Sequence, residues 1–439
     1  MPRVSTWNDY VAVEAQEVRT PRNEAEVAAI VRAVRERGGR LRAIGGRHSF
    51  NDLPLCRETI VDLSNLAGVL EIDHAQRRVR VEGGIRLRDL VVVLEREGLA
   101  LPNIGAWTAQ TIAGVVSTAT HGSCGRWRKD LIDAVLAIRV VDGHGVAREL
   151  DASERGFLTL GMFGVITSVT LQCEPLYSVI KNKDVVDMER TIERIPELLR
   201  IHDHVDLRWV GRVRPGILTT WERFEGPLSP RDRVLTEVEG VGLNLLNRAV
   251  DRVPIARAPA RFKDLFYGAM GLAYVIGAET PPVGQVWHRG LTFNSRGFAP
   301  RHDEHEFAVP IDEAIPCLLD VRRTMADSRD SAGIEVQIRF TPGINLVLAP
   351  HYHQDSVWVN FNVFDRARCR PLVETMTEAL LDFGARPHWC KTIPDAASHL
   401  RSLHGDDAEL WENARRRADP DGVFLNDWYD RYLAPPRDA

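Results

Sequence analysis

The segment RAIGGRHSFNDL, residues 42–53, constrains the fold of this chain more than any other stretch. Its first residues are typical of a short strand, and that strand must end where Gly45 and Gly46 follow one another. A second glycine-rich segment with a histidine, STATHGSCG, occupies residues 117–125. Glycines let backbone N–H groups approach an anion closely, so two such loops predict a pyrophosphate site between them. Either loop alone is equally consistent with a tight turn that carries an incidental histidine.

The first 175 residues alternate between helix and strand patterns. Residues 23–39 predict a helix, because Asn23 and Glu26 have the spacing of a capping box and apolar residues recur at i, i+3, i+4 and i+7. Gly38 then ends the pattern. Further strands are expected at 59–63, 68–73, 78–84 and 164–175, and a second helix at 86–99.

The character of the chain changes after residue 175. Residues 176–330 are richer in Arg, Trp and Pro, with the loop signals PLSPRDRV and ETPPVGQVW. Strand patterns return at 334–340, 345–350 and 356–364, and helix patterns follow at 370–384 and 406–418. We therefore expect an α+β fold with two domains, residues 1–175 and 176–405, and a C-terminal segment, 406–439.

Composition excludes several classes of protein. The 439 residues carry a net charge of −5 with both signs interspersed, which gives no footprint for nucleic acid or an anionic membrane. No apolar run approaches the roughly 20 residues that span a bilayer. The N-terminus lacks the apolar core of a secretory signal, and the six cysteines are scattered without a CxxC pair. We expect reduced thiols, a cytoplasmic location, no membrane span and no nucleic acid partner.

Several catalytic signatures are absent from the sequence. It contains no GxxxxGK[ST], no GxGxxG between a strand and a helix, no HExxH and no GxSxG. The clusters HDEHE (302–306) and HYH (351–353) lack a complementary third and fourth ligand in a recognisable frame. We interpret their histidines as solvated loop residues and expect no metal.

The order of the motifs points to a family. RAIGGRHSFNDL and TIAGVVSTATHG are followed by ARPHWCK (385–391) and DPDGVFLNDWYDRYL (419–433). This series resembles the vanillyl-alcohol oxidase superfamily of flavoproteins, and most of all its aldonolactone (gulonolactone, arabinonolactone) and alditol (xylitol, sorbitol) oxidases. The resemblance covers residues 5–175 and 334–433. It implies a PCMH-type FAD-binding domain over 1–175, a substrate-binding cap domain with an antiparallel sheet over 176–405, and a tail that returns to the FAD domain.

The resemblance also implies where FAD binds. In such enzymes the histidine of the first loop is bonded to the flavin 8α-methyl carbon, and here that residue is His48; the alternative is a histidine without a covalent link. The residues expected around the cofactor are Gly45, Gly46, Arg47, His48, Ser49 and Phe50 at the pyrophosphate, Ser117, Thr118, His121, Gly122 and Ser123 on a second wall, and Gly164 and Val165 near the adenine or pyrophosphate.

The strand IEVQIRF departs from the family pattern. It places Glu335, Gln337 and Arg339 on one face, because successive side chains of a strand alternate. The resembling enzymes have Glu-x-Arg at the last two of these positions. Glutamine holds a hydroxyl by hydrogen bonds but cannot take its proton. Either Gln337 only positions the substrate or another group is the base, and Glu335 is the weaker candidate.

Four further residues are expected at the substrate. Arg339 would stabilise the anionic reduced flavin or a developing alkoxide, unless it forms a surface ion pair. Lys391, together with His388 before it, would lie near the flavin or the substrate oxygens, where a desolvated lysine can act as base. Asn360 stands where gulonolactone-type oxidases carry asparagine, which favours a lactone or cyclic sugar; its alternative is cross-strand hydrogen bonding.

The expected function is FAD-dependent oxidation of a CH–OH group of a sugar, sugar lactone or polyol. Hydride would pass to flavin N5, and O2 is the expected acceptor, giving H2O2. One alternative is an oxygen-poor dehydrogenase acting on a specialised-metabolite or amino-sugar hydroxyl; Ala119, where many relatives carry glycine, raises this possibility. Another alternative is a flavin-binding module that has lost catalysis, which Gln337 suggests.

Overall fold

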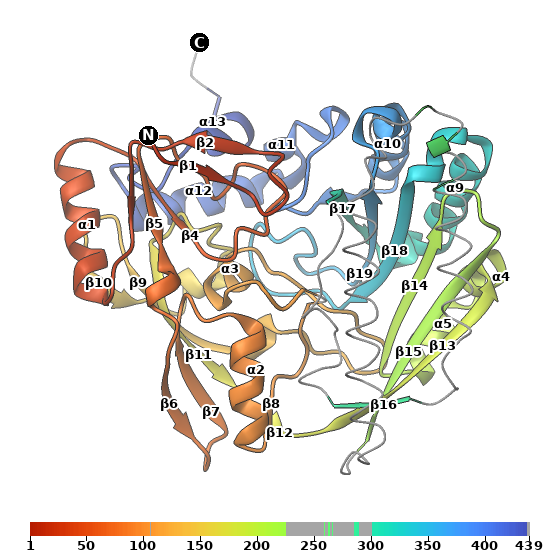
Figure 1. Cartoon of the computed structure of the whole chain (residues 1–439), viewed down its shortest axis with the longest axis horizontal. Coiled ribbons are helices and arrows are strands. Elements are labelled where there is room, and N and C mark those ends of the chain that lie inside the picture. Colours follow the sequence, from red (N-terminus) through yellow and green to blue (C-terminus); the bar gives the residue numbers. More distant parts are fainter. Residues whose placement is uncertain are drawn as a thin grey trace.

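The computed structural model describes residues 1–105, 107–224, 259, 262, 263, 266, 285–288 and 301–436. Within these ranges the chain forms a small parallel sheet, a five-stranded sheet and an eight-stranded antiparallel sheet, all flanked by helices (Figure 1). The expected α+β fold is confirmed.

The first glycine-rich loop begins where a strand of a three-stranded parallel sheet ends. In spatial order its strands are β3 (Glu17–Arg19), β5 (Thr59–Asp62) and β4 (Leu41–Ile44). Helix α1 (Glu24–Glu36) joins β3 to β4 and begins where the Asn23 side chain accepts a 2.9 Å hydrogen bond from the N–H of Glu26. The loop therefore starts at the carboxyl end of β4, the edge where open parallel sheets usually bind ligands.

The second glycine-rich segment follows helix α3 (Ile112–Ser117), which shares a core with the five-stranded sheet. The strands of this antiparallel sheet are, in spatial order, β10 (Ala147–Glu149), β9 (Val135–Val141), β11 (Val165–Gln172), β7 (Arg78–Glu82) and β6 (Val69–Asp73). Helix α2 (Leu87–Arg96) joins the same core. Two short pairs complete this half: β1 (Arg3–Ser5) with β2 (Ala12–Glu14), and β8 (Leu99–Ala100) with β12 (Glu174–Pro175).

The eight-stranded sheet occupies the other half of the molecule (Figure 1). In spatial order its strands are β16 (Gln285–His288), β13 (Ser178–Asp187), β15 (Pro215–Phe224), β14 (His204–Val210), β18 (Ile334–Thr341), β19 (Ser356–Val363), β17 (Asp303–Pro310) and β20 (Arg386–Pro387). The register aligns Glu306, Asn360, Gln337 and Arg208 across four neighbouring strands.

The two faces of this sheet differ in polarity. One face packs against helices α4 (Met188–Glu193), α5 (Ile195–Ile201), α9 (Ala314–Asp327) and α10 (Arg366–Asp382). Val336 and Ile338 of β18 belong to this apolar core, so Gln337 and Arg339 must point to the opposite face. We call this opposite face the polar sheet face; it turns toward the glycine-rich loops.

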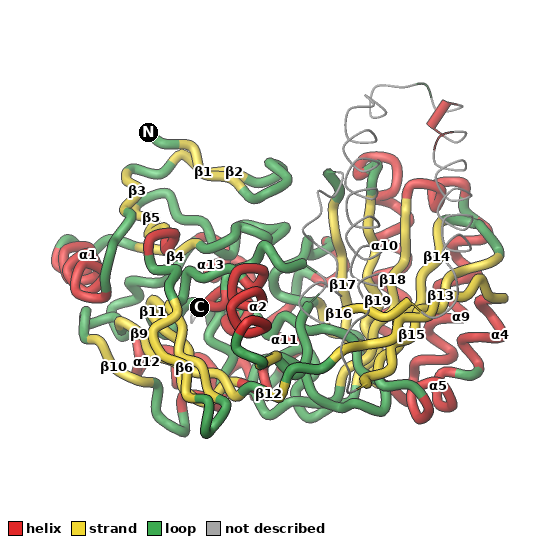
Figure 2. The backbone as a smooth tube through the Cα atoms, turned by 60° about the horizontal axis from the view of Figure 1, so that its bottom comes forward, coloured by secondary structure: helices red, strands yellow, loops and turns green. Residues whose placement is uncertain are grey.

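The C-terminal segment packs on the N-terminal half. Its helices are α11 (Leu400–His404), α12 (Asp406–Ala418) and α13 (Asp427–Tyr432). The N–H of Leu41 donates to Val423 O at 2.7 Å, and α12 lies among the N-terminal strands in both ribbon views (Figures 1 and 2). The division of the chain at residue 175 stays a prediction.

One strand prediction is wrong. Residues 345–350 form a loop in which Leu348 has φ = 75°, although Val347 makes an isolated bridge to Phe157. The apolar side chains that suggested a strand instead fill a core shared with Trp389 and helix α12. Helix α10 also begins at Arg366, four residues before the predicted start.

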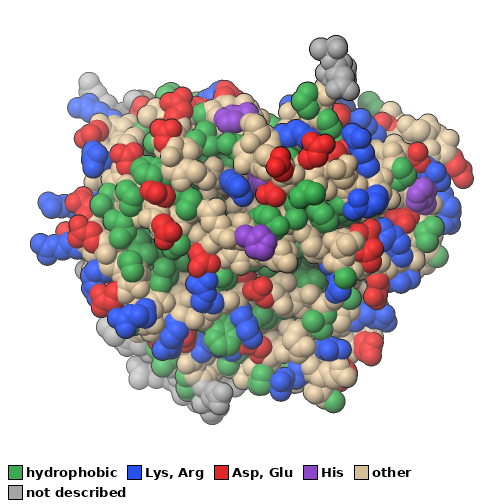
Figure 3. Space-filling view, turned by 180° about the vertical axis from the view of Figure 1, so that it is seen from behind, with side chains coloured by type: hydrophobic (Ala, Val, Ile, Leu, Met, Phe, Trp, Pro, Cys, Tyr) green, Lys and Arg blue, Asp and Glu red, His purple; other side chains and the backbone are tan. Residues whose placement is uncertain are grey.

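Charges of both signs are interspersed over the face shown in Figure 3. Among the described helices, none has the length and apolar character needed to cross a bilayer. All six cysteines are free thiols, and five of them are buried.

Candidate active site

A cavity lies between the first glycine-rich loop and the end of α3. Of the residues expected around FAD, its wall contains Gly45, Gly46, Arg47, His48, Ser49, Ser117, Thr118 and Gly164. It also contains Arg42, Gln110, Thr111 and Cys390, which the sequence did not single out as cofactor residues.

Gly45 and Gly46 allow the loop to lie directly on residues 109–111. A Cβ atom at Gly45 would overlap with the Thr111 hydroxyl, and one at Gly46 would come within 2.8 Å of Ala109 O. Neither overlap can be relieved by a flexible side chain end, since one neighbour is backbone and the other is buried. These two glycines therefore bring the walls of the cavity together.

Arg42 makes the cavity suitable for an anion. Its buried guanidinium donates to Leu160 O at 2.6 Å and to Phe424 O at 2.8 Å, and burial lowers its pKa to about 10. Within the described part of the chain, no carboxylate lies at ion-pair distance from it. A buried cation without a counterion favours a ligand that carries negative charge, such as the pyrophosphate of FAD.

Unfilled hydrogen-bonding groups in the same wall also fit FAD. The side-chain oxygens of Gln110 and Thr111 are buried and have no partner among the described residues. Buried polar atoms normally have a partner, so these two indicate a ligand with polar groups. When bound, FAD supplies an acceptor for the hydride of an alcohol carbon.

His48 occupies one end of the cavity. Its Nε2 accepts a 2.9 Å hydrogen bond from the indole N–H of Trp107. Burial, together with the charges of Arg86 and Lys391, lowers the pKa of His48 to about 3. The imidazole is therefore neutral near pH 7, the form in which it is a nucleophile.

The structure places His121, Gly122 and Ser123 away from the cavity wall. The chain turns out of α3 at Ala119, where φ is +49°, and the following residues meet the large sheet instead. Gly122 N–H donates to Asp130 at 3.1 Å, and Ser123 Oγ accepts from the N–H of Phe340 at 3.2 Å. These three residues do not line this cavity, and their assignment to a second wall around FAD stays a prediction.

Phe50 and Val165 also lie outside the wall. Phe50 N–H donates to Cys390 O at 2.7 Å, and its ring packs edge-on against Trp7. Val165 points into the core of the five-stranded sheet, while its neighbours Gly164 and Ile166 line the cavity.

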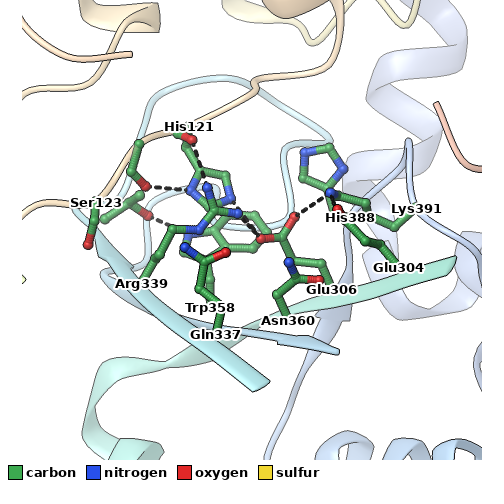
Figure 4. A network of polar contacts seen from close by, with 12 residues as sticks. His121, Ser123, Glu304, Glu306, Gln337, Arg339, Trp358, Asn360, His388 and Lys391 are labelled. Atoms are coloured by element: carbon green, nitrogen blue, oxygen red, sulfur yellow. Dashed lines mark hydrogen bonds and ion pairs between the residues drawn. The ribbon is translucent and has the colours of Figure 1, made fainter. Parts of the chain in front are cut away.

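An ion pair dominates the polar sheet face (Figure 4). Arg339 donates from Nη2 to Glu306 and from Nη1 to His121 O at 3.2 Å. Burial opposes ionisation of Glu306, but Arg339 outweighs it and holds the pKa of this carboxyl well below its usual range. Glu306 therefore carries a permanent negative charge at the centre of the site.

The two histidines beside Glu306 differ in their hydrogen bonds. His121 Nδ1 donates to Gly122 O at 2.9 Å, so its neutral ring has a lone pair on Nε2, which lies 3.5 Å from Glu306 Oε1. His388 Nδ1 accepts from Cys390 N–H at 3.1 Å, so its neutral ring carries the proton on Nε2. Burial lowers the pKa of His388 to about 4. These hydrogen bonds fix which nitrogen carries the proton in the neutral form of each ring.

Lys391 joins the same network. Its Nζ contacts Glu304 and lies 3.8 Å from Glu306 Oε2. Burial lowers the pKa of Lys391 to about 7, although the adjacent carboxylates favour its charged form. Glu304 in turn accepts from His302 Nε2 at 2.9 Å.

The interpretation of HDEHE as a solvated loop is wrong. Residues 303–310 form strand β17, and His302 and His305 are each 8% exposed. The apolar run FAVP, which follows directly at 307–310, was the available signal. His351 of the HYH cluster is likewise buried, with its ring 5.1 Å from Trp358.

Three of these side chains have the spacing of metal ligands. The ligand atoms of His121, Glu306 and His388 lie within 4.8 Å of one another. However, Arg339 already binds the Glu306 carboxylate, and Lys391 adds a second positive charge beside it. This arrangement favours an ion pair over a metal cation.

Gln337 and Asn360 occupy the middle of the polar sheet face (Figure 4). Gln337 Nε2 donates to Asp206, which also accepts from Arg208 Nε at 2.8 Å. Asn360 Oδ1 is buried and has no partner among the described residues. The structure thus brings Gln337, Arg339, Asn360, His388 and Lys391 together, and it adds Asp206, Glu304 and Glu306, which sequence reasoning missed.

Residues 388–391 connect the cavity to the polar sheet face. Cys390 lines the cavity, and the Asn51 side chain donates to Trp389 O at 2.7 Å. On the other side, His388 N–H donates to Glu306 O at 2.8 Å. A ligand in the cavity and one on the sheet face would therefore share this short segment.

Comparison with known proteins agrees with this architecture. The profile of the FAD binding domain matches residues 15–151, and that of D-arabinono-1,4-lactone oxidase matches residues 169–432. The chain is 28% identical to L-gulono-1,4-lactone dehydrogenase of Mycobacterium tuberculosis, over 99% of this chain and 100% of that protein. It is 27% identical to alditol oxidase of a Streptomyces species, over 96% of this chain and 97% of the relative.

Solved structures share the fold at low identity. Cholesterol oxidase of Brevibacterium sterolicum superposes with a TM-score of 0.74 at 14% identity, over 98% of this chain and 96% of that one. Glucooligosaccharide oxidase of Acremonium strictum, described with 6-S-cysteinyl, 8α-N1-histidyl FAD, gives 0.67 at 14% identity, over 96% and 93%. Because the lactone oxidase profile matches more than half of the chain and an FAD binding domain precedes it, this protein belongs to the D-arabinono-1,4-lactone oxidase family of FAD-dependent oxidoreductases.

Proposed function

We propose that this enzyme oxidises a CH–OH group of an aldonolactone, or of a related sugar or polyol, by hydride transfer to N5 of FAD. O2 is the proposed acceptor, which gives H2O2. The observation that carries the proposal is the polar sheet face, where buried hydrogen-bonding groups lie beside a cavity that fits FAD. Its family membership supports a lactone as the first substrate to test.

The polar sheet face offers hydrogen bonds that suit a hydroxyl-rich ligand. Asn360 Oδ1, Arg339 Nε and His121 Nε2 are buried, and none has a hydrogen-bond partner among the described residues. A hydroxyl both donates and accepts, so adjacent hydroxyls of one sugar can satisfy all three atoms. Asn360 and Arg339 are proposed to hold the substrate, and Gln337, fixed by Asp206, to position it.

The hydroxyl proton needs an acceptor when hydride leaves the carbon. Gln337 cannot take it, Arg339 is always protonated, and neutral His388 has no free lone pair. His121 presents a buried lone pair on Nε2, and Glu306 would stabilise the imidazolium that forms. We propose His121 as the proton acceptor and Lys391 as a positioning cation.

This assignment predicts a contrast between two variants. His121→Asn should slow anaerobic flavin reduction by about 100-fold or more. The acidic limb in the pH profile of this rate should also disappear. Lys391→Met should weaken substrate binding while the acidic limb persists. The opposite pattern would make Lys391 the base.

FAD is proposed to attach covalently through His48. The neutral imidazole lines the cavity, and a covalent histidyl flavin is described for the structurally similar glucooligosaccharide oxidase. Acid precipitation of the purified protein should give a yellow pellet, and His48→Ala should leave the flavin in the supernatant. A colourless wild-type pellet would remove the covalent link but not FAD binding.

A substrate panel tests the proposed reaction. L-gulono-1,4-lactone, D-arabinono-1,4-lactone, xylitol and sorbitol would each be assayed for peroxide formation and for reduction of a dye acceptor. Turnover of a lactone with stoichiometric peroxide supports the proposal. Failure of every lactone, sugar and polyol in both assays contradicts it and favours a flavin-binding module without catalysis.

A dehydrogenase is the second candidate. Ala119 holds a left-handed backbone, φ = +49°, that glycine adopts without strain, and it is buried in an apolar core directly after Thr118 of the cavity wall. The relative from M. tuberculosis is named a dehydrogenase. Dye reduction without peroxide would establish this alternative, and Ala119→Gly should then increase peroxide formation.

A reducing compartment such as the cytoplasm is proposed for this enzyme. The six free thiols support it, because oxidising compartments favour disulfides. Fractionation of cells that express the full chain would test the location directly.

A further inference from the structure

Two tryptophans pack against His48. The indole N–H of Trp107 lies 2.9 Å from His48 Nε2, and the Trp7 ring lies 6.1 Å from the His48 ring and 6.0 Å from the Trp107 ring. Both tryptophans are partly exposed, and neither lines the cavity, whereas His48 does. His48 therefore connects the cavity to a small aromatic surface outside it.

Three arginines border this aromatic surface. The carbonyl oxygen of Arg47 accepts from Trp7 N–H at 3.0 Å. The Arg86 side chain and the Arg88 N–H donate to carbonyl oxygens of the two residues that follow Trp107, at 2.7 and 2.9 Å. Arg47 and Arg88 are exposed, and Arg86 is partly exposed. We call the two tryptophans and the three arginines the arginine–tryptophan surface.

The arginine–tryptophan surface is positively charged. In the part of the chain that the structure describes, no carboxylate lies at ion-pair distance from Arg47 or Arg86, and Arg88 has only Asp89, at 3.7 Å. Burial, followed by charges that include all three arginines, lowers the pKa of His48 to about 3. The whole chain carries a net charge of −5. The arginines thus form a local cationic patch on an anionic protein.

This combination suits a planar ligand with negative charge, because such a ligand stacks on an indole ring and pairs with guanidinium groups. Its place beside His48 indicates an electron acceptor, since electron transfer slows steeply with distance from the flavin. We propose that the arginine–tryptophan surface binds a planar anionic acceptor of the quinone class, which reoxidises the reduced flavin in addition to O2. This inference rests on the proposed function, which attaches the flavin to His48.

The electrons and protons of this step balance. Oxidation of the substrate transfers a hydride to the flavin, which is two electrons and one proton. A quinone takes up these two electrons, this proton and one further proton from water, and it leaves as a hydroquinone. The flavin returns to its oxidised form, and no bond to the protein forms or breaks.

The test is anaerobic reoxidation of the FAD-loaded enzyme after its reduction with one equivalent of dithionite, so that no sugar substrate is needed. Stopped-flow absorption follows the flavin after mixing with anionic 2,6-dichlorophenolindophenol or with cationic phenazine methosulfate. Arg88→Glu should slow reoxidation by the anionic dye about fivefold or more and accelerate reoxidation by the cationic dye. Damage to the fold would not shift the two rates in opposite directions.

Arg96→Glu is the matched control for Arg88→Glu. Arg96 is an exposed arginine in the last turn of the same helix, α2, about 12 Å further along its axis. The two variants have the same net charge, so an effect of overall charge would appear equally in both. Arg96→Glu should react with both dyes at close to the wild-type rates.

Salt provides a second test on the wild type. Attraction of the anionic dye by the arginines should weaken when salt is added, so its reaction should become slower. The net charge of −5, acting alone, would repel this dye and give the opposite salt dependence.

Binding is measured without turnover by equilibrium dialysis of the oxidised, FAD-loaded enzyme against anthraquinone-2-sulfonate. Trp7→Leu and Arg88→Glu should each weaken binding about fivefold or more, and Arg96→Glu should not.

Several results would overturn the inference. Equal rates in Arg88→Glu and Arg96→Glu, a change in the same direction with both dyes, or a reaction of the anionic dye that salt accelerates would each refute it. If Arg88→Glu does not fold, the salt dependence of the wild type and dialysis with Trp7→Leu decide the question. Failure of these tests in an enzyme whose flavin is bleached by a lactone refutes this inference alone, whereas a protein that binds no FAD refutes both proposals.

Discussion

Gln337 and Asp206 form a hydrogen-bonded pair on the polar sheet face, and this pair explains the departure from the Glu-x-Arg pattern. Asp206 accepts from both Gln337 and Arg208, so its carboxylate is already satisfied. A glutamate at position 337 would place a second negative charge against it. The sequence identified position 337 as unusual but could not reveal its partner, because Asp206 lies 131 residues away on another strand.

Gln337→Glu should therefore destabilise the protein. Two buried carboxylates in contact lower the free energy of unfolding by about 2–4 kcal/mol. One of them must either take up a proton or move away from the other. Asp206→Asn in the same chain should restore most of this loss by exchanging the amide and the carboxylate. Urea unfolding of the wild type and the two variants measures the effect, and a Gln337→Glu variant as stable as the wild type would refute the explanation.

His404 should make the protein sensitive to acid. It is buried against Trp389, with ring centroids 4.8 Å apart, and burial lowers its pKa to about 3. The unfolded chain, with a histidine pKa of about 6.5, binds the proton more readily, so stability is full above pH 6.5 and is lost as pH falls toward 3.

His404→Phe should remove this part of the acid sensitivity. Between pH 7 and pH 5 the wild type should lose about 2 kcal/mol more unfolding free energy than the variant. Urea unfolding at the two pH values is the measurement. Identical losses in both proteins would show that His404 does not contribute.

At the scale of elements, the sequence predicted those helices and strands whose signals lie within a few neighbouring residues. The capping box at Asn23 located the start of α1, and alternation in IEVQIRF located β18 and its polar face. Strand β17 was missed because four charged or imidazole side chains precede its apolar residues and the partners that bury them are remote. Residues 345–350 have strand composition, but their tertiary contacts favour a loop.

Gly45→Ala tests how the glycine-rich loop forms the cavity. The added methyl group would overlap with the Thr111 hydroxyl, push the loop away from residues 109–111 and weaken FAD binding by about tenfold or more. The double variant Gly45→Ala, Thr111→Ala should recover part of the affinity. FAD retention after gel filtration, in a His48→Ala background that removes the proposed covalent link, measures both, and full retention by Gly45→Ala would contradict the packing argument.

At the scale of the whole molecule, contacts between distant segments complete the site. Asn51 reaches Trp389, and Leu41 reaches Val423, across more than 300 residues of sequence. The family resemblance predicted that the C-terminal segment returns to the FAD domain. The residues that hold it there, and the placement of Glu306 beside Arg339, depend on tertiary packing that no local pattern encodes.

Asn426 is the main polar anchor of this returning segment. Its Nδ2 donates to Leu53 O at 3.0 Å and to Leu55 O at 2.8 Å, and its Oδ1 caps α13. Asn426→Ala should cost about 2–3 kcal/mol of unfolding free energy. Asp430→Ala, which breaks an exposed ion pair with Arg40, should cost less than about 1 kcal/mol. Equal losses in the two variants would contradict this role.

The most direct test of the account is anaerobic mixing of the FAD-loaded enzyme with L-gulono-1,4-lactone, D-arabinono-1,4-lactone and a polyol while the visible absorption of the flavin is followed. We expect at least one of them to bleach the oxidised flavin at a rate that saturates with its concentration. Asn360→Leu, which removes the amide proposed to hold the substrate, should raise the concentration needed for half-saturation. Flavin that stays oxidised with every lactone, sugar and polyol would contradict the central claim.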